Sequence, residues 1–355
     1  MSKVRARDLG IPFDGQPGAL NAITDVAGVE VGMTTLVSGE GPLDQGKGPV
    51  RTGVTVIHPR GRVRAFEPVW AGRHTLNGNG EMTGVHWIDE AGYFTGPVAI
   101  TNTNGIGMAH HGVTRWLIEH PNFDADGHEW SLPVVAETWD GYLNDINGLH
   151  IHHNEVMDAC DAASAGTVEE GNVGGGTGMI CYEFKGGTGT ASRVFEGAGG
   201  RYTLGVLVQA NFGRRDDLMI RGVPVGRHLQ DNRISKPDDG SIIAVAATDA
   251  PLMPHELERV AQRLGFGIGR TGTIGSNSSG DILLAFSTAN DVAAGISRAS
   301  ADYLSDDAMD AVFRAAVEAT EEAIINAMVA AETMTGRDGR TVHAIDHDAL
   351  AALFA

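Results

Sequence analysis

The sequence predicts a layered α/β or α+β fold, with short buried strands through most of the chain and amphipathic helices near its end. Six apolar stretches of six or seven residues are rich in Val, Ile or aromatic residues and lie between turn-forming residues. Several of them lack polar alternation, which indicates a sheet covered on both faces. The predicted strands are residues 53–58, 96–101, 178–184, 203–209, 241–247 and 281–287.

Two helices are predicted in the last third of the chain. The first begins at Pro254, which suits a first helical turn, and carries an apolar stripe from Leu257 to Leu264. The second begins after Ser305, a good N-cap followed by two aspartates at the positive end of the helix dipole. We expect this helix to end at Gly336. Strands mixed with helices in this way are typical of layered folds.

Glycine is unusually frequent, with 49 residues, and its clusters between apolar stretches predict tight turns. Residues 267–272 match GxGxxG by letter, but they follow a predicted helix instead of opening one after a strand, so we do not expect a dinucleotide site. Residues 174–178 and 186–190 lack the ending of a phosphate-binding loop and are predicted turns. Residues 227–240 are predicted to form a polar loop leading into a core strand.

The charge balance excludes several classes of partner. The chain has 26 Lys and Arg against 45 Asp and Glu, a formal charge of −19. This charge argues against nucleic-acid phosphates and anionic membrane surfaces as partners, and it favours cationic ligands such as free amines. No apolar run is long enough to span a membrane, and no apolar signal region follows the basic N-terminus. We therefore expect a soluble, cytoplasmic protein.

No metal site is predicted. Histidines occur in two local groups, His110 with His111, and His150 with His152 and His153. In a strand His150 and His152 would share a face, but no HExxH motif or diagnostic carboxylate accompanies them. The two cysteines are too few for a disulfide scaffold or a four-cysteine zinc site. Solvated or hydrogen-bonded histidines are the favoured interpretation.

The Gly240–Ser241 junction offers a candidate for chemistry. If this bond were cut, Ser241 would begin a buried strand with a hydroxyl and an α-amine on the same residue. An α-amine has a pKa of about 7.7–8.0, so it can accept a proton near neutral pH. Gly240 tolerates strained backbone angles and leaves its carbonyl open to attack. On local sequence alone, an ordinary surface loop remains the alternative.

A second serine-rich segment, residues 275–281, also lies directly before an apolar strand. If the two strands are neighbours, Ser279 and Asp281 come close to Ser241. An ordinary polar turn is the alternative here.

The chain resembles the DmpA/BapA-type self-processing serine aminopeptidases, a family that includes the L-aminopeptidase/D-esterase-amidases and the β-peptidyl aminopeptidases. The resemblance extends over nearly the whole chain and is strongest around DDGSIIAVAATDAPLMPHELERVAQR and GIGRTGTIGSNSSGDILLAFSTAN. Further motifs occur in the family's order. They are LGIPFDGQPGALNAITDVAGVEVG, HTLNGNGEMTG, AITNTNGIG, AETWDGYLNDING, GNVGGGTGM and GVLVQANFGRR.

The resemblance implies a single self-processing peptidase domain over residues 1–355, cut between Gly240 and Ser241. The products would be an α chain, residues 1–240, and a β chain, residues 241–355, that stay associated. The implied fold is a four-layer αββα sandwich, similar to Ntn hydrolases and ornithine acetyltransferase but with a connectivity different from that of Ntn hydrolases. The resemblance also implies a homo-oligomer, often a tetramer of α/β units, that needs no cofactor.

The resemblance also assigns roles to individual residues. Ser241 matches the nucleophile and Ser279 the second active-site serine, which contacts the nucleophile. Asp281 occupies an acidic position where β-peptide-cleaving relatives carry Glu, whose side chain reaches one methylene further. Asn211 matches the side chain that helps hold the oxyanion. Two further matches are Tyr142, a tyrosine near the scissile centre, and Glu137, the candidate carboxylate for the substrate's α-ammonium.

These assignments predict an autoprocessed aminopeptidase that cleaves after the N-terminal residue of short peptides, amino-acid amides or esters. Its partner would be a small substrate with a free amine. Three alternatives stay open. They are an endo-acting amidase on oligomeric amides, an acyltransferase of the same fold (against which Ser241 counts, because that family uses threonine), and an unprocessed binding protein. For Glu137, a buried structural acid is the alternative role.

Overall fold

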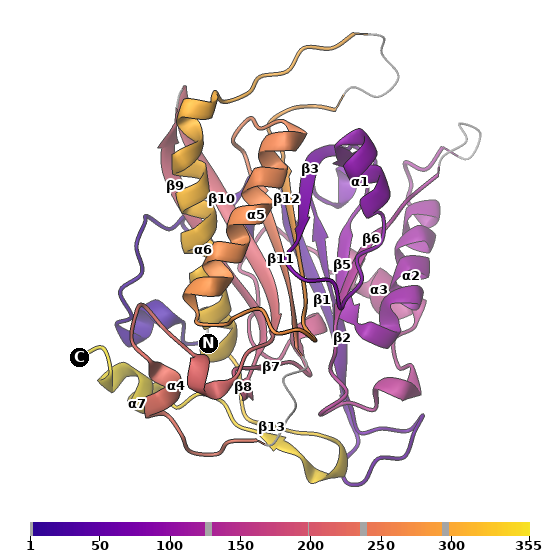
Figure 1. The fold of residues 1–355 in the computed structure, drawn as a ribbon. Coiled ribbons are helices and arrows are strands. Elements are labelled where there is room, and N and C mark those ends of the chain that lie inside the picture. The colour runs from indigo at the N-terminus through magenta and orange to yellow at the C-terminus, as the bar shows by residue number, and fades with distance from the viewer. Residues whose placement is uncertain (1–2, 125–129, 198, 235–239, 293–297) are drawn as a thin grey trace.

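The computed structural model describes residues 3–124, 130–197, 199–234, 240–292 and 298–355. Its two main sheets pack face to face, and each of them is covered on its outer face by helices (Figure 1). The layers run helix, sheet, sheet, helix, which confirms the predicted four-layer αββα sandwich.

The larger sheet has the strand order β4-β3-β12-β11-β10-β9. Its strands are β3 (Val69–Thr75), β4 (Tyr93–Phe94), β9 (Gly187–Gly197), β10 (Gly200–Asn211), β11 (Ser241–Thr248) and β12 (Gly280–Ser287). The smaller sheet has the order β1-β2-β5-β6. Its strands are β1 (Glu30–Ser38), β2 (Val50–His58), β5 (Val98–Asn102) and β6 (Val134–Thr138).

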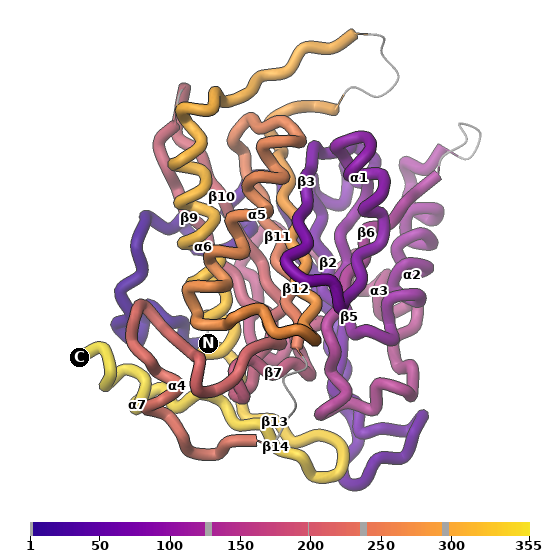
Figure 2. The backbone as a smooth tube through the Cα atoms, viewed as in Figure 1, coloured from indigo at the N-terminus to yellow at the C-terminus, as the bar shows by residue number. Residues whose placement is uncertain are grey.

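Helices α5 (Pro254–Arg270) and α6 (Met309–Val329) cover the larger sheet, and α2 (Ile106–Glu119) and α3 (His153–Asp161) cover the smaller one. Figure 2 shows the two pairs on opposite outer sides of the strands. Shorter elements complete the chain. They are α1 (Val85–Ala91), α4 (Val225–His228), α7 (His347–Ala352), β7 (Ile180–Cys181), β8 (Phe184–Lys185), β13 (Met334–Thr335) and β14 (Thr341–Val342). No helix in the described part of the chain is long and apolar enough to cross a membrane.

Strand β11 shows why its sequence lacks alternation. Ile243 and Val245 belong to the core between the two sheets, whereas Ile242 and Ala244 belong to the core beneath α5 and α6. Both faces of the strand are therefore buried in apolar surroundings, as the continuous apolar run predicts.

Two predicted segments differ from the structure. Residues 178–184 do not form one strand, because Tyr182 and Glu183 have φ of 53° and 62° and turn the chain back between β7 and β8. Residues 186–190, a predicted turn, instead lie largely in β9. The glycines serve close packing there, since a Cβ on Gly189 would lie 2.1 Å from the Ala323 carbonyl oxygen of α6.

The predicted start of α5 at Pro254 is correct, but the predicted end of α6 is wrong, because α6 stops at Val329 and not at Gly336. The side chain of Asn172 replaces helical bonding here: its amide donates to the Glu332 carbonyl (2.8 Å) and its oxygen accepts from the Glu332 N–H (2.9 Å). The chain then enters the short β13–β14 pair, so a longer helix is excluded.

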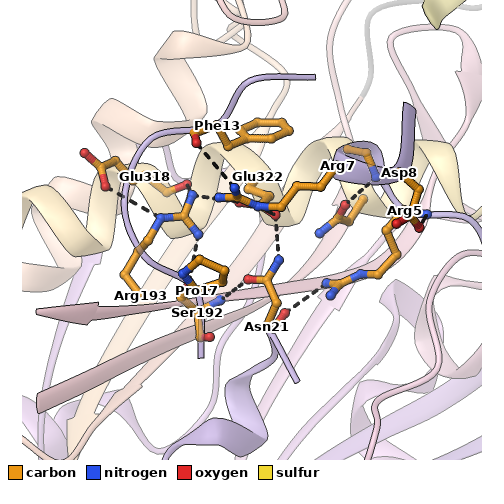
Figure 3. A network of polar contacts seen from close by, with 12 residues as sticks. Arg5, Arg7, Asp8, Phe13, Pro17, Asn21, Ser192, Arg193, Glu318 and Glu322 are labelled. Carbon is orange, nitrogen blue, oxygen red and sulfur yellow. Dashed lines mark hydrogen bonds and ion pairs between the residues drawn. The ribbon is translucent and has the colours of Figure 1, made fainter. Parts of the chain in front are cut away.

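A cluster of charged side chains joins α6 to β9 and to the N-terminal segment (Figure 3). We call Arg7, Arg193, Glu318 and Glu322 the α6 cluster. Arg193 Nη2 lies 2.7 Å from Glu322 Oε2, and Arg7 binds both oxygens of the same carboxylate at 2.8 Å. Arg193 and Glu322 are buried, with 1% and 0% of their surface exposed. This cluster connects residues before position 240 with a helix after it.

Candidate active site

Three neighbouring strands of the larger sheet place the predicted catalytic residues side by side. Ser241, the first residue of β11, lies opposite Asn211 at the end of β10. On its other side Ser241 is in register with Gly280, the first residue of β12. Because β10 runs antiparallel and β12 parallel to β11, the end of one strand and the beginnings of two others meet at the same edge. Ser241 and Ser279, far apart in sequence, are thereby brought together.

Ser241 is almost enclosed, with 4% of its surface exposed. Alternation along the strand places it on the same face as Ile243, which is directed at the smaller sheet. The carbonyl oxygen of the preceding residue, Gly240, accepts a hydrogen bond from the Gly280 N–H at 3.3 Å. The Gly240–Ser241 peptide is thus held between the ends of two strands. Residues 235–239 of the predicted loop lie outside the described residues.

Asp281 connects the second serine to the strand of the first. Its Oδ1 accepts from Ser279 Oγ at 2.6 Å and from the Ile242 N–H at 3.2 Å. Its backbone N–H donates to Asn77 Oδ1 at 2.7 Å, and its Oδ2 accepts from Asn77 Nδ2 at 3.1 Å. The carboxylate orients the Ser279 hydroxyl, and Asn77 holds the residue in place from the loop that follows β3.

Asn211 is fixed on both ends of its amide. Its Oδ1 accepts from the Ile180 N–H and its Nδ2 donates to the Trp139 carbonyl, both at 2.8 Å. Asn211 is 1% exposed and stands opposite Ser241 in the register. The second N–H of the amide is the group that such an arrangement can offer to a developing oxyanion.

Glu137 approaches the serines from the smaller sheet, near the end of β6. A Cβ on Gly80 would lie 3.3 Å from Glu137 Oε1 and 3.2 Å from the Gly280 Cα, so this glycine brings the carboxylate and the start of β12 close together. Glu137 accepts from the Glu81 N–H (3.0 Å) and from the Thr103 hydroxyl. Burial is the main effect on Glu137 and raises its pKa, although both hydrogen bonds act in the opposite direction.

The surroundings of Glu137 matter because its charge is not balanced. It is 3% exposed, and no Lys or Arg of the described residues forms an ion pair with it. A buried carboxylate held by neutral donors favours the binding of a cation.

Tyr142 lies in the turn after β6, and none of the hydrogen bonds of the described residues joins it to either serine. Its side chain packs against the small apolar cluster of Leu143, Ile180 and Val342, and the Arg340 guanidinium lies 5.0 Å from the ring centre. Arg340 also donates to the Tyr142 carbonyl at 3.3 Å. Tyr142 is linked to the site through its turn, because that turn also contains Trp139, whose carbonyl binds Asn211.

Three residues of the site were not singled out from the sequence: Asn77, Thr103 and Lys185. Asn77 and Thr103 lie within the motifs HTLNGNGEMTG and AITNTNGIG, but the motifs alone do not show which side chain binds which carboxylate. Lys185 carries a clearer signal, because it is a single cation within an apolar and glycine-rich stretch. Such a residue is rarely buried without a specific reason.

The predicted glycine and histidine features have ordinary structural roles. Residues 267–272 lie at the end of α5, which excludes the arrangement of a dinucleotide site. His150 pairs with Asp145 at 2.9 Å, and His153 lies 2.7 Å from Arg115. Within the described ranges, no three His, Cys, Asp or Glu side chains are grouped so as to hold a metal ion.

Comparison with known proteins identifies a family. Residues 21–342 match the model of peptidase family S58. The chain is 51% identical to the β-peptidyl aminopeptidase BapA of Sphingosinicella microcystinivorans, over 98% of this chain and 91% of that protein. It is 50% identical to the enzyme of the same name from Sphingosinicella xenopeptidilytica, over 98% and 90% of the two chains.

Solved structures give the same result for the fold. The L-aminopeptidase D-Ala-esterase/amidase of Ochrobactrum anthropi, described as a prototype of the serine aminopeptidases and a new variant of the Ntn hydrolase fold, superposes with a TM-score of 0.93. The two chains are 52% identical, with 98% of this chain and 97% of that chain covered. A β-aminopeptidase from a Burkholderia species superposes with a TM-score of 0.89 at 46% identity, over 99% and 98% of the chains.

Proposed function

The chain belongs to peptidase family S58 and is a serine aminopeptidase, and we propose that it becomes active by cutting itself between Gly240 and Ser241. The observation that supports this proposal most directly is the position of Ser241. It is the first residue of a buried strand, beside Asn211 and Gly280, and it follows a glycine whose carbonyl is already hydrogen-bonded.

In this proposal, self-cleavage is an acyl shift from nitrogen to oxygen at the Gly240–Ser241 bond. Ser241 Oγ attacks the Gly240 carbonyl carbon, and the Gly280 N–H stabilises the negative charge that develops on the Gly240 oxygen. The C–N bond breaks, the hydroxyl proton passes to the departing nitrogen, and an ester joins Gly240 to Ser241 Oγ. Water hydrolyses this ester, which leaves a carboxylate on Gly240 and a free α-amine on Ser241.

The free α-amine then supplies the base for turnover. Ser241 Oγ attacks the substrate carbonyl while the amine takes its proton. Asn211 contributes an N–H to the tetrahedral oxyanion. The protonated amine gives its proton to the leaving group. Water then hydrolyses the acyl-enzyme ester, which releases the acyl group as a carboxylic acid and restores the Ser241 hydroxyl. Ser279, oriented by Asp281 at 2.6 Å, is placed to hold the α-amine in position.

We propose short peptides, amino-acid amides and esters with a free amine as substrates. Glu137 is the residue that selects them, because its buried carboxylate has no cationic partner in the described part of the chain and lies beside Gly280. A substrate ammonium bound there places the first carbonyl group next to the nucleophile. The relatives are named as a β-peptidyl aminopeptidase and as an L-aminopeptidase and D-Ala-esterase/amidase. A β-peptide with an unblocked N-terminus and a D-Ala ester or amide both present a free amine.

An intact-mass measurement on freshly purified protein tests the proposal. We expect two species of roughly 25 and 12 kDa, in proportion to chain length, with the smaller beginning at Ser241. Ser241→Ala should remain a single 37.3 kDa species without peptidase activity. Ser300→Ala, which removes an exposed hydroxyl elsewhere in the same predicted fragment, is the control and should cleave normally. A wild-type chain that stays intact and still hydrolyses peptides would overturn the mechanism.

A further inference from the structure

Lys185 is a buried cation that the proposed mechanism does not use. It ends β8, and none of its surface is exposed. Its Nζ donates to the Met179 carbonyl at 2.6 Å and to the Gly186 carbonyl at 2.8 Å, with the Gly176 carbonyl at 3.5 Å. No carboxylate of the described chain forms an ion pair with it. An ammonium group surrounded by neutral carbonyls is costly to bury, so its position calls for an explanation.

The carbonyl of Met179 belongs to the peptide unit that holds Asn211. The C=O of this unit accepts from Lys185, and its N–H, which is that of Ile180, donates to Asn211 Oδ1 at 2.8 Å. A peptide unit is planar, so fixing its oxygen also fixes the direction of its N–H. A positive charge on the oxygen also polarises the unit and strengthens the hydrogen bond donated from its other end.

The segment before this peptide has little means of holding itself in place. Four of the five residues from 174 to 178 are glycines, and the described fold positions them by close backbone contacts. A Cβ on Gly176, for example, would lie 2.2 Å from the Thr188 nitrogen. The Gly186 N–H also donates to the Met179 carbonyl at 3.0 Å, so the turn keeps one hydrogen bond without the lysine. Removing the lysine charge should therefore disturb the peptide without unfolding the turn.

We infer that Lys185 is a positioning residue for catalysis: it orients the Met179–Ile180 peptide and thereby holds the Asn211 amide toward the oxyanion beside Ser241. This inference rests on the proposed function, in which Asn211 stabilises the oxyanion. Lys185 does not touch the substrate and acts only through Asn211. A cation here serves better than an apolar side chain of equal length, because only the cation binds the carbonyl oxygen.

A double-mutant cycle tests this inference. Lys185→Met keeps an unbranched side chain, one atom shorter, and removes the charged amine. The kcat is expressed per cleaved chain as counted by intact mass. We expect Asn211→Ala to lower kcat by about 10²–10³-fold and Lys185→Met to lower it by about 10-fold, with KM changed by less than about 2-fold. In the Asn211→Ala background, Lys185→Met should have almost no further effect.

The controls separate failure of the inference from failure of the proposed function. Lys47→Met removes an exposed lysine and should leave kcat unchanged. Lys185→Gln replaces Lys185→Met if the latter does not fold. Asn211→Asp replaces Asn211→Ala if the latter does not cleave, because aspartate keeps the Oδ1 held by Ile180 and lacks the amide N–H.

The outcomes distinguish a failure of the positioning role of Lys185 from a failure of the proposed function. An equal loss of kcat from Lys185→Met in both backgrounds, or no loss in either, would overturn the positioning role and leave the proposed function intact. A wild-type kcat in the Asn211 variant would remove the oxyanion role of Asn211, and the role of Lys185 would fail with it.

Discussion

Two sets of buried charged side chains in the described chain differ in how their charges are balanced. In the α6 cluster, Glu322 contacts both Arg193 and Arg7 at 2.7–2.8 Å. At the ends of the strands, Glu137 is bound by a hydroxyl and a backbone N–H, and Lys185 by carbonyl oxygens. The first group is neutralised within the described protein, whereas the second group is not.

The pKa values of Glu322 and Glu137 shift in opposite directions, in line with this difference in charge balance. Burial acts to raise the pKa of Glu322, but the hydrogen bond from Arg7 and the charges of Arg193 and Arg7 outweigh it, so the pKa lies below its usual range. Burial also dominates at Glu137, where no cation opposes it, and the pKa is raised. Glu322 is thus compensated by cations within the fold, whereas Glu137 keeps the raised pKa of a buried carboxyl without a cationic partner.

Arg193→Met tests the structural half of this comparison and should have the largest effect. Removing one partner of a buried ion pair costs about 3–5 kcal/mol, because the remaining carboxylate loses part of its compensation. We expect a large fall in the apparent Tm, measured by calorimetry on the cleaved protein, with kcat unchanged at temperatures where the protein is folded.

Arg115→Met is the matched control for this prediction. Arg115 forms an exposed i,i+4 pair with Glu119 at 2.7 Å on helix α2, and such pairs contribute less than about 1 kcal/mol. If both substitutions lowered the Tm equally, the α6 cluster would have no special structural role.

Glu137→Gln tests the functional half of the comparison. A hydrogen bond to a charged group is worth about 1.5–3 kcal/mol, so kcat/KM for a substrate with a free amine should fall by about 10–100-fold. The activity should fall mainly through KM, while the much smaller activity on the N-acetylated form of the same substrate should change little. Steady-state kinetics on both substrates measure the effect.

The neighbouring Glu81→Gln provides the control for Glu137. Glu81 is exposed and holds Glu137 through its backbone N–H, which the substitution keeps. Its kinetics should match the wild type. If Glu137→Gln instead lowered the Tm and left the preference for a free amine unchanged, Glu137 would be a structural acid.

The strand ends also show which parts of the site can be predicted from sequence. Two apolar strands carry Ser241, Ser279 and Asp281 at or just before their first residues. These residues come together once the two strands are neighbours in the sheet. The continuous apolar run of β11 likewise predicts a strand covered on both faces. These features depend on local pattern and on one pairing, so the sequence contains them.

Other features depend on contacts between distant segments. The hydrogen bonds of Glu137 come from Glu81 and Thr103, in two separate segments of the chain. Lys185 binds the Met179 carbonyl across the turn at Tyr182 and Glu183, where the sequence predicts a continuous strand. The end of α6 is similar, because the Asn172 side chain that caps the chain there lies 160 residues away from Glu332. Tertiary partners of this kind override local propensity.

The smallest predicted effect is on the pH dependence of stability, and it concerns Asp140, a buried carboxyl that forms no ion pair with the described residues. Asp140 lies in the turn after β6, and burial is the main cause that raises its pKa to about 7, against hydrogen bonds such as that from Asn144 at 3.0 Å. Between about pH 4 and 7 the folded protein therefore keeps a proton that the unfolded chain has lost. Stability falls as pH rises through this window, because ionisation favours the unfolded chain.

Lys185 has the opposite effect in the next window. Burial, with a smaller contribution from the charge of Lys3, lowers its pKa to about 7, while Cys181 and Asp140 act to raise it. Above about pH 7 the folded protein loses this proton before the unfolded chain does, so stability rises with pH until about pH 10. Together the two groups contribute a minimum of stability near neutral pH.

Asp140→Asn should remove only the acidic side of this minimum. We expect the apparent Tm of the variant to fall less than that of the wild type between pH 4.5 and 7, by a few degrees, and to follow the wild type above pH 7. Asp158→Asn, at an exposed position on α3, should reproduce the wild-type profile. Parallel Tm profiles for Asp140→Asn and the wild type would mean that Asp140 is ionised across the whole range, and its burial would then be balanced as fully as that of Glu322.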